Sequence, residues 1–92
     1  MRTLLVALSH PDDEVGCAGT IAAHVAQGDR VVLLWLTRGS MTAQLGPLTP
    51  EEVARRRTEH GEEAARLLGA EARFLDFEDT RVEATRAAAY EV

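Results

Sequence analysis

Two apolar runs joined by one helical pattern constrain the fold of this chain most. Residues 2–9 are dominated by apolar side chains and residues 31–36 are apolar throughout, which is typical of strands buried on both faces of a parallel sheet. Residues 14–27 repeat apolar side chains at helical spacing and are followed by Gly28, which ends the helix. Because parallel strands need a crossover connection, this pattern predicts a right-handed β-α-β unit.

The rest of the chain extends this unit. The run Thr49-Pro50-Glu51-Glu52 supplies an N-cap, a proline at the first helical position and two acids in the first turn, so a helix is predicted from residue 50 to about residue 68. Residues 70–77 predict a third strand and residues 82–92 a third helix. Residues 41–49 predict a loop that is either a substrate flap or a long connection.

These elements define the expected fold class. We expect an α/β, Rossmann-like three-layer β-α-β-α-β-α unit with a mostly parallel sheet. Three strands leave an open sheet edge with unpaired backbone groups. Residues 1–92 are therefore expected to form one partial domain, completed by a second copy in a homo-oligomer, by swapped elements, or by a missing C-terminal half.

Composition narrows the classes of function. The net charge of -5 over 92 residues argues against a nucleic-acid partner, and the pattern contains no basic face. The single cysteine excludes an intrachain disulfide and fits a reducing compartment. Residues 4–8 are too short for a signal peptide, and no apolar run approaches the ~20 residues that span a bilayer. We expect a cytoplasmic protein without a membrane partner.

The junction between the first strand and the first helix carries the chemistry. The run Ser9-His10-Pro11-Asp12-Asp13-Glu14 places one imidazole and three carboxylates in five positions. Like charges crowd unfavourably unless a positive group lies among them, and imidazole with carboxylates suits a catalytic zinc site. Acids that only cap the helix, beside a surface histidine, are the alternative. Spacing alone leaves both interpretations open.

A resemblance favours the metal site. Residues 9–14, followed by the small-residue run 16–20, resemble the entry motif of the PIG-L/LmbE-like family. The resemblance continues through residues 36–39, the arginine-rich helix that ends at residue 69, and residues 74–79. It covers essentially all of this chain but only about the first half of a family member. The family implies zinc-dependent removal of acyl groups from N-acetylglucosaminyl and related substrates.

The resemblance also implies a role for the matching residues of the junction. His10 and Asp13 would ligate Zn²⁺, or another divalent metal. Asp12 would be the general base that takes a proton from the attacking water. The mechanism implied is metal-assisted amide hydrolysis.

Four further residues are implied to contact the substrate. Arg56, in step with Glu59, would reach it from the second helix, although counting back from the end of that helix points to Arg57 instead. One residue rotates a helix by about 100°, so both arginines cannot serve the same role. Asp79 would hydrogen-bond sugar hydroxyls, and Thr37 and Gly39 would line the pocket.

The metal site is incomplete in this sequence. A catalytic zinc usually has three protein ligands, and the family's third ligand, from a downstream His-x-x-His segment, has no counterpart here. His24 and His60 are interpreted as solvent-facing or structural, and Cys17 as a small packing residue. Glu14 is interpreted as a capping acid or a support for the ligands.

Two hypotheses of function follow. The first is a metal-dependent hydrolase, or part of one, that removes an acetyl group from a small N-acetylated sugar conjugate. The second is a non-catalytic truncated relative that binds metal or sugar, or only keeps the fold. Whether a third metal ligand is present distinguishes the two hypotheses.

Overall fold

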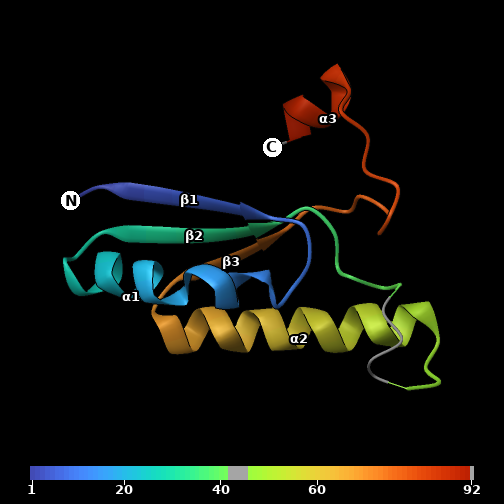
Figure 1. The fold of residues 1–92 in the computed structure, drawn as a ribbon, viewed down its shortest axis with the longest axis horizontal. Helices are drawn as coiled ribbons and strands as arrows, with labels where there is room; N and C mark the ends of the chain where they lie inside the picture. Colours follow the sequence, from blue (N-terminus) through green and yellow to red (C-terminus); the bar gives the residue numbers. More distant parts are fainter. Residues whose placement is uncertain (42–45, 92) are drawn as a thin grey trace.

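The computed structural model describes residues 1–41 and 46–91, and shows a three-stranded sheet with helices (Figure 1). The strands are β1 (Thr3–Leu8), β2 (Arg30–Trp35) and β3 (Glu71–Phe74). The helices are the 3-10 turn η1 (Asp13–Cys17), α1 (Ala18–Ala26), α2 (Pro50–Leu68) and α3 (Arg86–Glu91). The strands pair in the order β1-β2-β3, and both pairs are parallel. The predicted α/β class with a parallel sheet is therefore confirmed.

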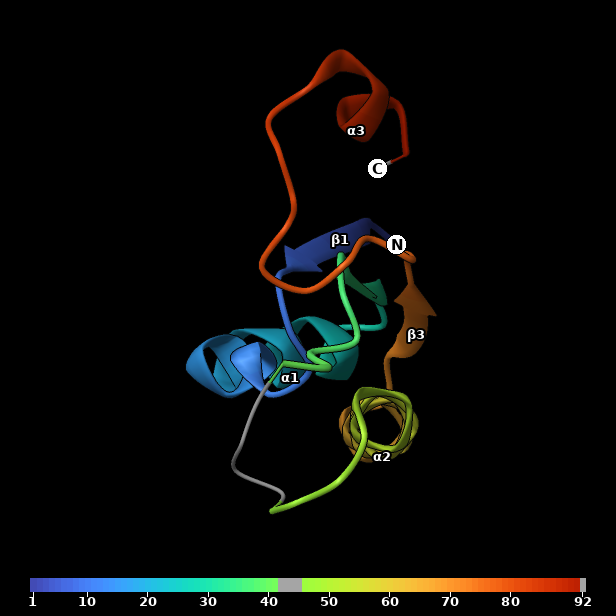
Figure 2. The same cartoon turned by 90° about the vertical axis from the view of Figure 1, so that its right-hand side faces the viewer.

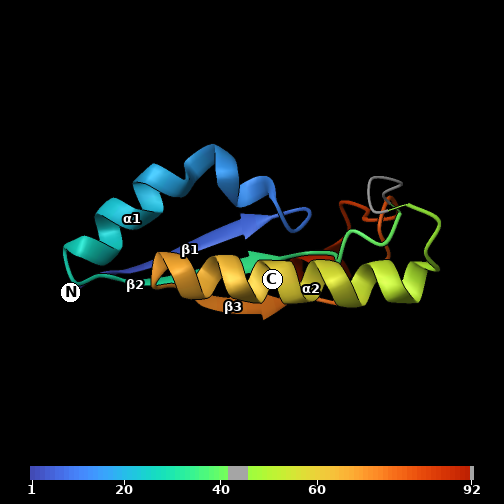
Figure 3. The same ribbon diagram turned by 90° about the horizontal axis from the view of Figure 1, so that it is seen from below.

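Both long helices cover the same face of the sheet. The chain steps from β1 to β2 and from β2 to β3 in one direction, so two crossovers of the same hand bring α1 and α2 to one side. Figure 3 views the molecule from the side that these helices cover. The short α3 stands on the other side of the sheet (Figure 2).

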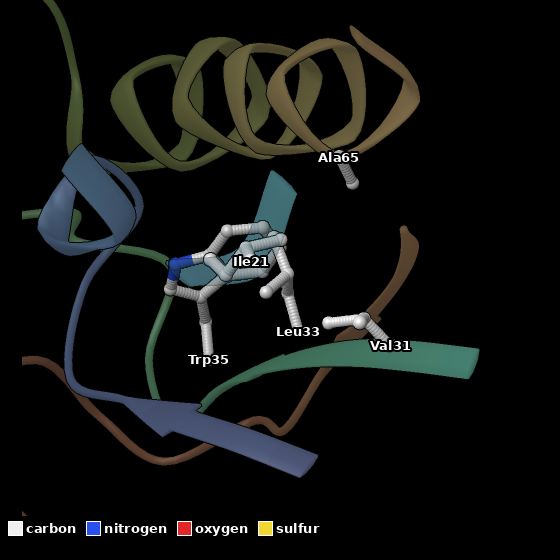
Figure 4. Close-up of a cluster of buried hydrophobic side chains, with 5 residues drawn as sticks. All are labelled: Ile21, Val31, Leu33, Trp35 and Ala65. Carbon is white, nitrogen blue, oxygen red and sulfur yellow. The ribbon is translucent and has the colours of Figure 1, made fainter. Parts of the chain in front are cut away.

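The core lies between β2 and these two helices. Five side chains are at most 1% exposed and form one cluster (Figure 4): Ile21, Val31, Leu33, Trp35 and Ala65. The Trp35 ring stacks on Phe74 with a centroid distance of 4.9 Å. This packing holds β2 at the centre of the layer, and so sets where its carboxyl end lies.

One prediction about the core is wrong. β1 was expected to be buried on both faces, but its side chains alternate between half-buried and exposed. Leu4, Val6 and Leu8 pack against the core cluster, whereas Leu5 is 52% exposed. The reason is that β1 is an edge strand of the described sheet, and the two long helices cover only one of its faces.

The helix boundaries follow local signals with one correction. α2 begins after Thr49, whose hydroxyl accepts the Glu52 N–H at 3.2 Å, and ends at Gly69 in the left-handed region (φ 77°). The segment expected to be one helix over residues 14–27 is divided instead into η1 and α1. Gly16 and Gly19 lower helix propensity where the two meet.

The later elements are shorter than predicted. The third strand covers only Glu71–Phe74 of the expected residues 70–77, and the third helix begins at Arg86 rather than at residue 82. Part of the predicted loop over residues 41–49, residues 42–45, lies outside the described residues. Within the described chain, no helix has the length and apolar character needed to cross a bilayer.

Candidate active site

The carboxyl ends of the three parallel strands meet at one edge of the sheet, where open α/β sheets bind ligands. His10 follows β1, Thr37 follows β2 and Asp79 follows β3. Thr37 joins the first two segments, because its N–H and its hydroxyl both donate to the carbonyl oxygen of Ser9, at 3.1 and 2.9 Å. The sheet edge therefore brings together residues far apart in the chain.

His10 and Asp79 form the central contact of this edge. His10 Nε2 lies 2.7 Å from Asp79 Oδ1, and the Met41 N–H donates to Asp79 Oδ2 at 2.8 Å. The Asp79 side chain is only 5% exposed. Burial alone would raise the pKa of Asp79, but the hydrogen bonds from Met41 and His10 outweigh it, so the pKa lies below its ordinary value.

Asp13 approaches the other nitrogen of the same ring. His10 Nδ1 lies 3.8 Å from Asp13 Oδ2, which also accepts the backbone N–H of His10 at 2.8 Å. The Asp13 N–H in turn donates to the His10 carbonyl oxygen at 3.2 Å. This reciprocal turn holds the carboxylate near the ring, and both side chains remain partly open to solvent.

Asp12 stands in an unusual backbone conformation. Its φ of 111° lies in the left-handed region, which non-glycine residues seldom adopt. Its N–H donates to Glu14 Oε2 at 2.8 Å, and Glu14 is 5% exposed. The buried Glu14 thus supports the strained turn, while the Asp12 side chain is 63% exposed and open to solvent. Such strain at a site residue is often part of a mechanism.

Arg57 reaches this turn from α2. Its guanidinium donates to the Pro11 carbonyl oxygen and lies 3.3 Å from Asp12 Oδ2, and the side chain is 11% exposed. It also packs on Gly39, where an added Cβ would come within 2.8 Å of the guanidinium carbon. Arg56 lies on the exposed side of the helix. The structure brings Arg57 to the site, and the substrate contact expected of Arg56 stays a prediction.

The other candidate residues make contacts within the protein. The hydroxyl of Thr37, buried at 1% exposure, accepts the Gly39 N–H at 3.2 Å in addition to its bond with Ser9. Cys17 packs against the core cluster. His24 Nδ1 pairs with Asp29 Oδ2 at 2.9 Å, and His60 is exposed. Cys17 agrees with the packing role expected for it. His24, expected to face solvent, is partly buried and paired with Asp29, whereas His60, expected to be structural, is exposed.

Sequence reasoning missed a cavity beside Asp79. It has a volume of about 530 Å³, and its lining includes Arg38, Met41, Asp79 and Arg81. The Arg38 guanidinium lies 4.9 Å above the Phe74 ring and donates to Thr58 Oγ1 at 2.9 Å. An arginine directly after a strand is a weak sequence signal for a cavity, because only the fold brings the segments after β2 and β3 and one residue of α2 around the same space.

The donor set fits part of a zinc site. His10 Nδ1 and the Asp13 carboxylate are borderline and hard donors of the kind found in catalytic zinc sites. The opposite nitrogen of the ring already contacts a carboxylate, as is usual for metal-binding histidines. Among residues 1–41 and 46–91, no three His, Cys, Asp or Glu side chains gather closely enough to hold a metal ion. A third donor would therefore have to come from outside them.

The fold and the site define the class of this protein, an α/β domain with acidic groups and a histidine at the ligand-binding edge of its sheet. Residues 5–92 match the model of the PIG-L family, described as GlcNAc-PI de-N-acetylase. The match covers nearly the whole chain, and the chain belongs to this family.

Individual relatives agree with the family. The chain is 39% identical over 88 residues to the diacetylchitobiose deacetylase of Thermococcus kodakarensis, an alignment that covers 94% of this chain and 33% of the relative. It therefore spans about a third of the length of that protein. Its fold matches the N,N'-diacetylchitobiose deacetylase of Pyrococcus horikoshii, bound to an inhibitor, with a TM-score of 0.90 at 33% identity, covering 97% of this chain and 34% of that one.

A second solved structure carries a different activity in its name. The 4-carboxy-2-hydroxymuconate hydratase GalB of Pseudomonas putida matches with a TM-score of 0.84 at 30% identity. That match covers 95% of this chain and 39% of the hydratase. The shared fold therefore occurs in proteins with more than one reaction.

Proposed function

We propose that this chain forms the part of an N-deacetylase that contains His10, Asp12 and Asp13, and that it acts on a small N-acetylated sugar conjugate. The observation that carries the proposal is the geometry of His10, whose ring contacts Asp79 through Nε2 and faces Asp13 through Nδ1. Two deacetylases of diacetylchitobiose among the relatives support the substrate class. A reducing, cytoplasmic setting accords with the single cysteine.

In this proposal, some residues of the junction bind the metal and another transfers a proton. His10 and Asp13 would hold Zn²⁺ or another divalent metal, which supplies a Lewis acid and an acidified water. Asp12 accepts the proton of the attacking water, because its carboxylate is exposed at the turn and free to meet solvent. Arg57 orients that carboxylate from the side of α2 and balances its charge.

The third metal ligand lies outside the described part of this chain in the proposal. A catalytic zinc needs three protein donors, and the junction offers two. The third would come from a second copy or from further sequence, as the relatives are about three times as long. A site that stays at two donors would bind metal weakly.

The test combines metal binding with turnover. Zinc stoichiometry and release of acetate from N,N'-diacetylchitobiose are measured for the chain, for Asp12→Asn and for His10→Ala. We expect His10→Ala to lose zinc, and Asp12→Asn to keep zinc but lose at least about 100-fold in rate, the usual size of a general-base contribution. Bound zinc without any turnover, when a second copy or further sequence supplies the third donor, would favour the non-catalytic binding module instead.

Hydration is a second candidate reaction, favoured by the structural match to GalB. Adding water to a double bond also uses a polarised water and a proton-accepting carboxylate. Assaying the chain with 4-carboxy-2-hydroxymuconate, the compound in the name of that hydratase, beside the acetylated sugar, separates the two reactions. Loss of a conjugated absorbance without release of acetate would select hydration.

A further inference from the structure

We propose that the cavity beside Asp79 is a second substrate subsite, in which Arg38 and Asp76 together bind an uncharged hydroxylated ring. This ring is the part of the conjugate that does not lose the acetyl group. The inference rests on the proposed function for the kind of substrate, and its own basis is the geometry of Arg38 and Asp76 at the cavity wall.

Arg38 is held in place from two sides. Its guanidinium lies 4.9 Å above the Phe74 ring, and Nη1 donates to Thr58 Oγ1 at 2.9 Å. The Thr58 hydroxyl itself donates to the Ala54 carbonyl oxygen at 2.7 Å, so it can only accept from Arg38. The guanidinium is therefore ordered before any ligand arrives, which lowers the entropic cost of binding there.

The other edge of the same guanidinium is only weakly bonded. Its Nε and Nη2 both approach Oδ1 of Asp76 at 3.4 Å, longer than the ~2.7–3.2 Å of a well-formed hydrogen bond. The Asp76 side chain is 87% exposed, and both residues line the cavity. A donor edge and a carboxylate thus stand side by side, and each can form a shorter hydrogen bond with a ligand.

The charges of the lining select an uncharged ligand. A second pair of the same kind lies on the cavity wall, where Arg81 Nε is 3.6 Å from Glu78 Oε2. An anion would meet the carboxylates of Asp76 and Glu78, and a cation would meet two guanidinium groups. A hydroxyl suits both partners, because it accepts from Arg38 and donates to Asp76.

The cavity adjoins the junction that carries the proposed chemistry. Met41 and Asp79 line it, and Asp79 Oδ1 lies 2.7 Å from His10 Nε2. Its volume of about 530 Å³ lies within the ~300–1,000 Å³ of small-molecule sites. A conjugate whose acetamide lies beside His10 would therefore place its other ring in the cavity. A second sugar and a cyclitol both present the hydroxyls that this subsite needs.

The experiment adds N,N'-diacetylchitobiose or myo-inositol to the full chain without metal, and follows the Arg38 Nε–H and the backbone amides by NMR. We expect the Arg38 signal to shift on binding. The Kd for the disaccharide should rise about 10-fold in Arg38→Ala and in Asp76→Ala, the effect of one hydrogen bond to a charged group. Because the Asp76 side chain is 87% exposed, Asp76→Ala keeps the fold even if Arg38→Ala does not.

A matched control comes from a pair outside the cavity lining. Arg66 Nε donates to Glu63 Oε2 at 2.9 Å on an exposed part of α2, and Arg66→Ala should keep the Kd of the unaltered chain. The two probes separate the sources of the ring. An Arg38 shift with both assigns the subsite to hydroxylated rings in general, and a shift with the disaccharide alone assigns it to a sugar.

An unchanged Kd in Asp76→Ala overturns the inference, as does an Arg38 signal that neither probe shifts. Tighter binding in Asp76→Ala also overturns it, because Asp76 would then only block Arg38. Release of acetate is measured separately. A chain that binds the disaccharide at Arg38 but releases no acetate when its metal site is complete contradicts the proposed function and leaves the subsite supported.

Discussion

At the scale of single residues, the turn after β1 concentrates strain and charge in a few atoms. Asp12 holds a positive φ, and its carboxylate meets a guanidinium from a helix that begins nearly forty residues later in the chain. The buried Glu14 and the Arg57 side chain hold this conformation from two sides. Such an arrangement predicts that stability and function respond differently to substitutions here.

Substitutions of Asp12 separate backbone strain from the carboxylate. Asp12→Gly and Asp12→Ala both remove the proposed base, but only glycine accepts a φ of 111° without cost. We expect the glycine variant to be more stable than the alanine variant by about 1 kcal/mol, and both to lack activity. Urea unfolding of the two variants measures the difference. Equal stabilities would show that the turn is not strained.

The two neighbouring arginines should differ in their effect on stability. Arg57→Ala leaves the Pro11 carbonyl oxygen without its donor and opens space beside Gly39, so we expect a loss of about 1–3 kcal/mol. Arg56→Ala, on the exposed side of α2, should stay within about 0.5 kcal/mol. Urea unfolding of both variants checks this. A larger loss for Arg56→Ala would reverse the assignment of the helix register.

At the scale of elements, close packing decides where the helices tolerate side chains. Gly61 lies in α2 opposite the stacked rings, and a Cβ there would come within 3.1 Å of Phe74 and 3.3 Å of Trp35. Gly19 lies in α1, where an added Cβ meets no described atom within 4 Å. The same residue type therefore serves packing in one helix and not in the other.

This contrast predicts opposite outcomes for one substitution. Gly19→Ala should stabilise the chain by about 0.5–1 kcal/mol, the usual gain for alanine over glycine in a helix. Gly61→Ala should lower stability despite the same gain in propensity, because Trp35 is fully buried and has no room to move. The urea midpoints of the two variants compare them directly. A stabilised Gly61→Ala variant would mean that the Trp35 and Phe74 rings shift to make room for the added methyl group.

The start of β1 and the turn after α1 are joined by a pH-dependent contact. The hydrogen bond from His24, followed by that from the Arg2 N–H, lowers the pKa of Asp29 from its ordinary 3.8. A lowered folded pKa contributes stability above 3.8 that is lost as the pH falls through the folded pKa. We expect the urea midpoint to drop in this acidic range, and to drop less in Asp29→Asn. A parallel fall in both proteins would assign the acid sensitivity to other carboxylates.

At the scale of the whole molecule, the described chain is an incomplete layer structure. α1 and α2 cover one face of the sheet (Figures 1 and 2). Leu5 on edge strand β1 is half exposed. The chain spans about a third of its curated relative. In the proposed metal site, the junction would supply two of the three protein donors that a catalytic zinc usually has. Further protein packed against this domain would account for both features. It would supply the proposed third metal ligand and cover the exposed Leu5 side chain.

Local signals determined much of this protein in advance. The apolar runs predicted the parallel strands, Thr49-Pro50 predicted the start of α2 and Gly69 its approximate end, and residues 9–14 predicted the acidic junction. These signals work because capping, proline geometry and burial act over a few neighbouring residues. Resemblance of short motifs then identified the family that the whole-chain match shows.

Tertiary structure decided what depends on distant partners. Asp79 meets His10 across 69 positions of sequence, and Arg57 rather than Arg56 faces Pro11 because of how α2 rotates on the sheet. The exposure of β1 depends on strand order, which the apolar pattern of that strand does not contain. A sequence determines hydrogen-bonding capacity and periodicity locally, whereas which donor meets which acceptor depends on how the layers pack.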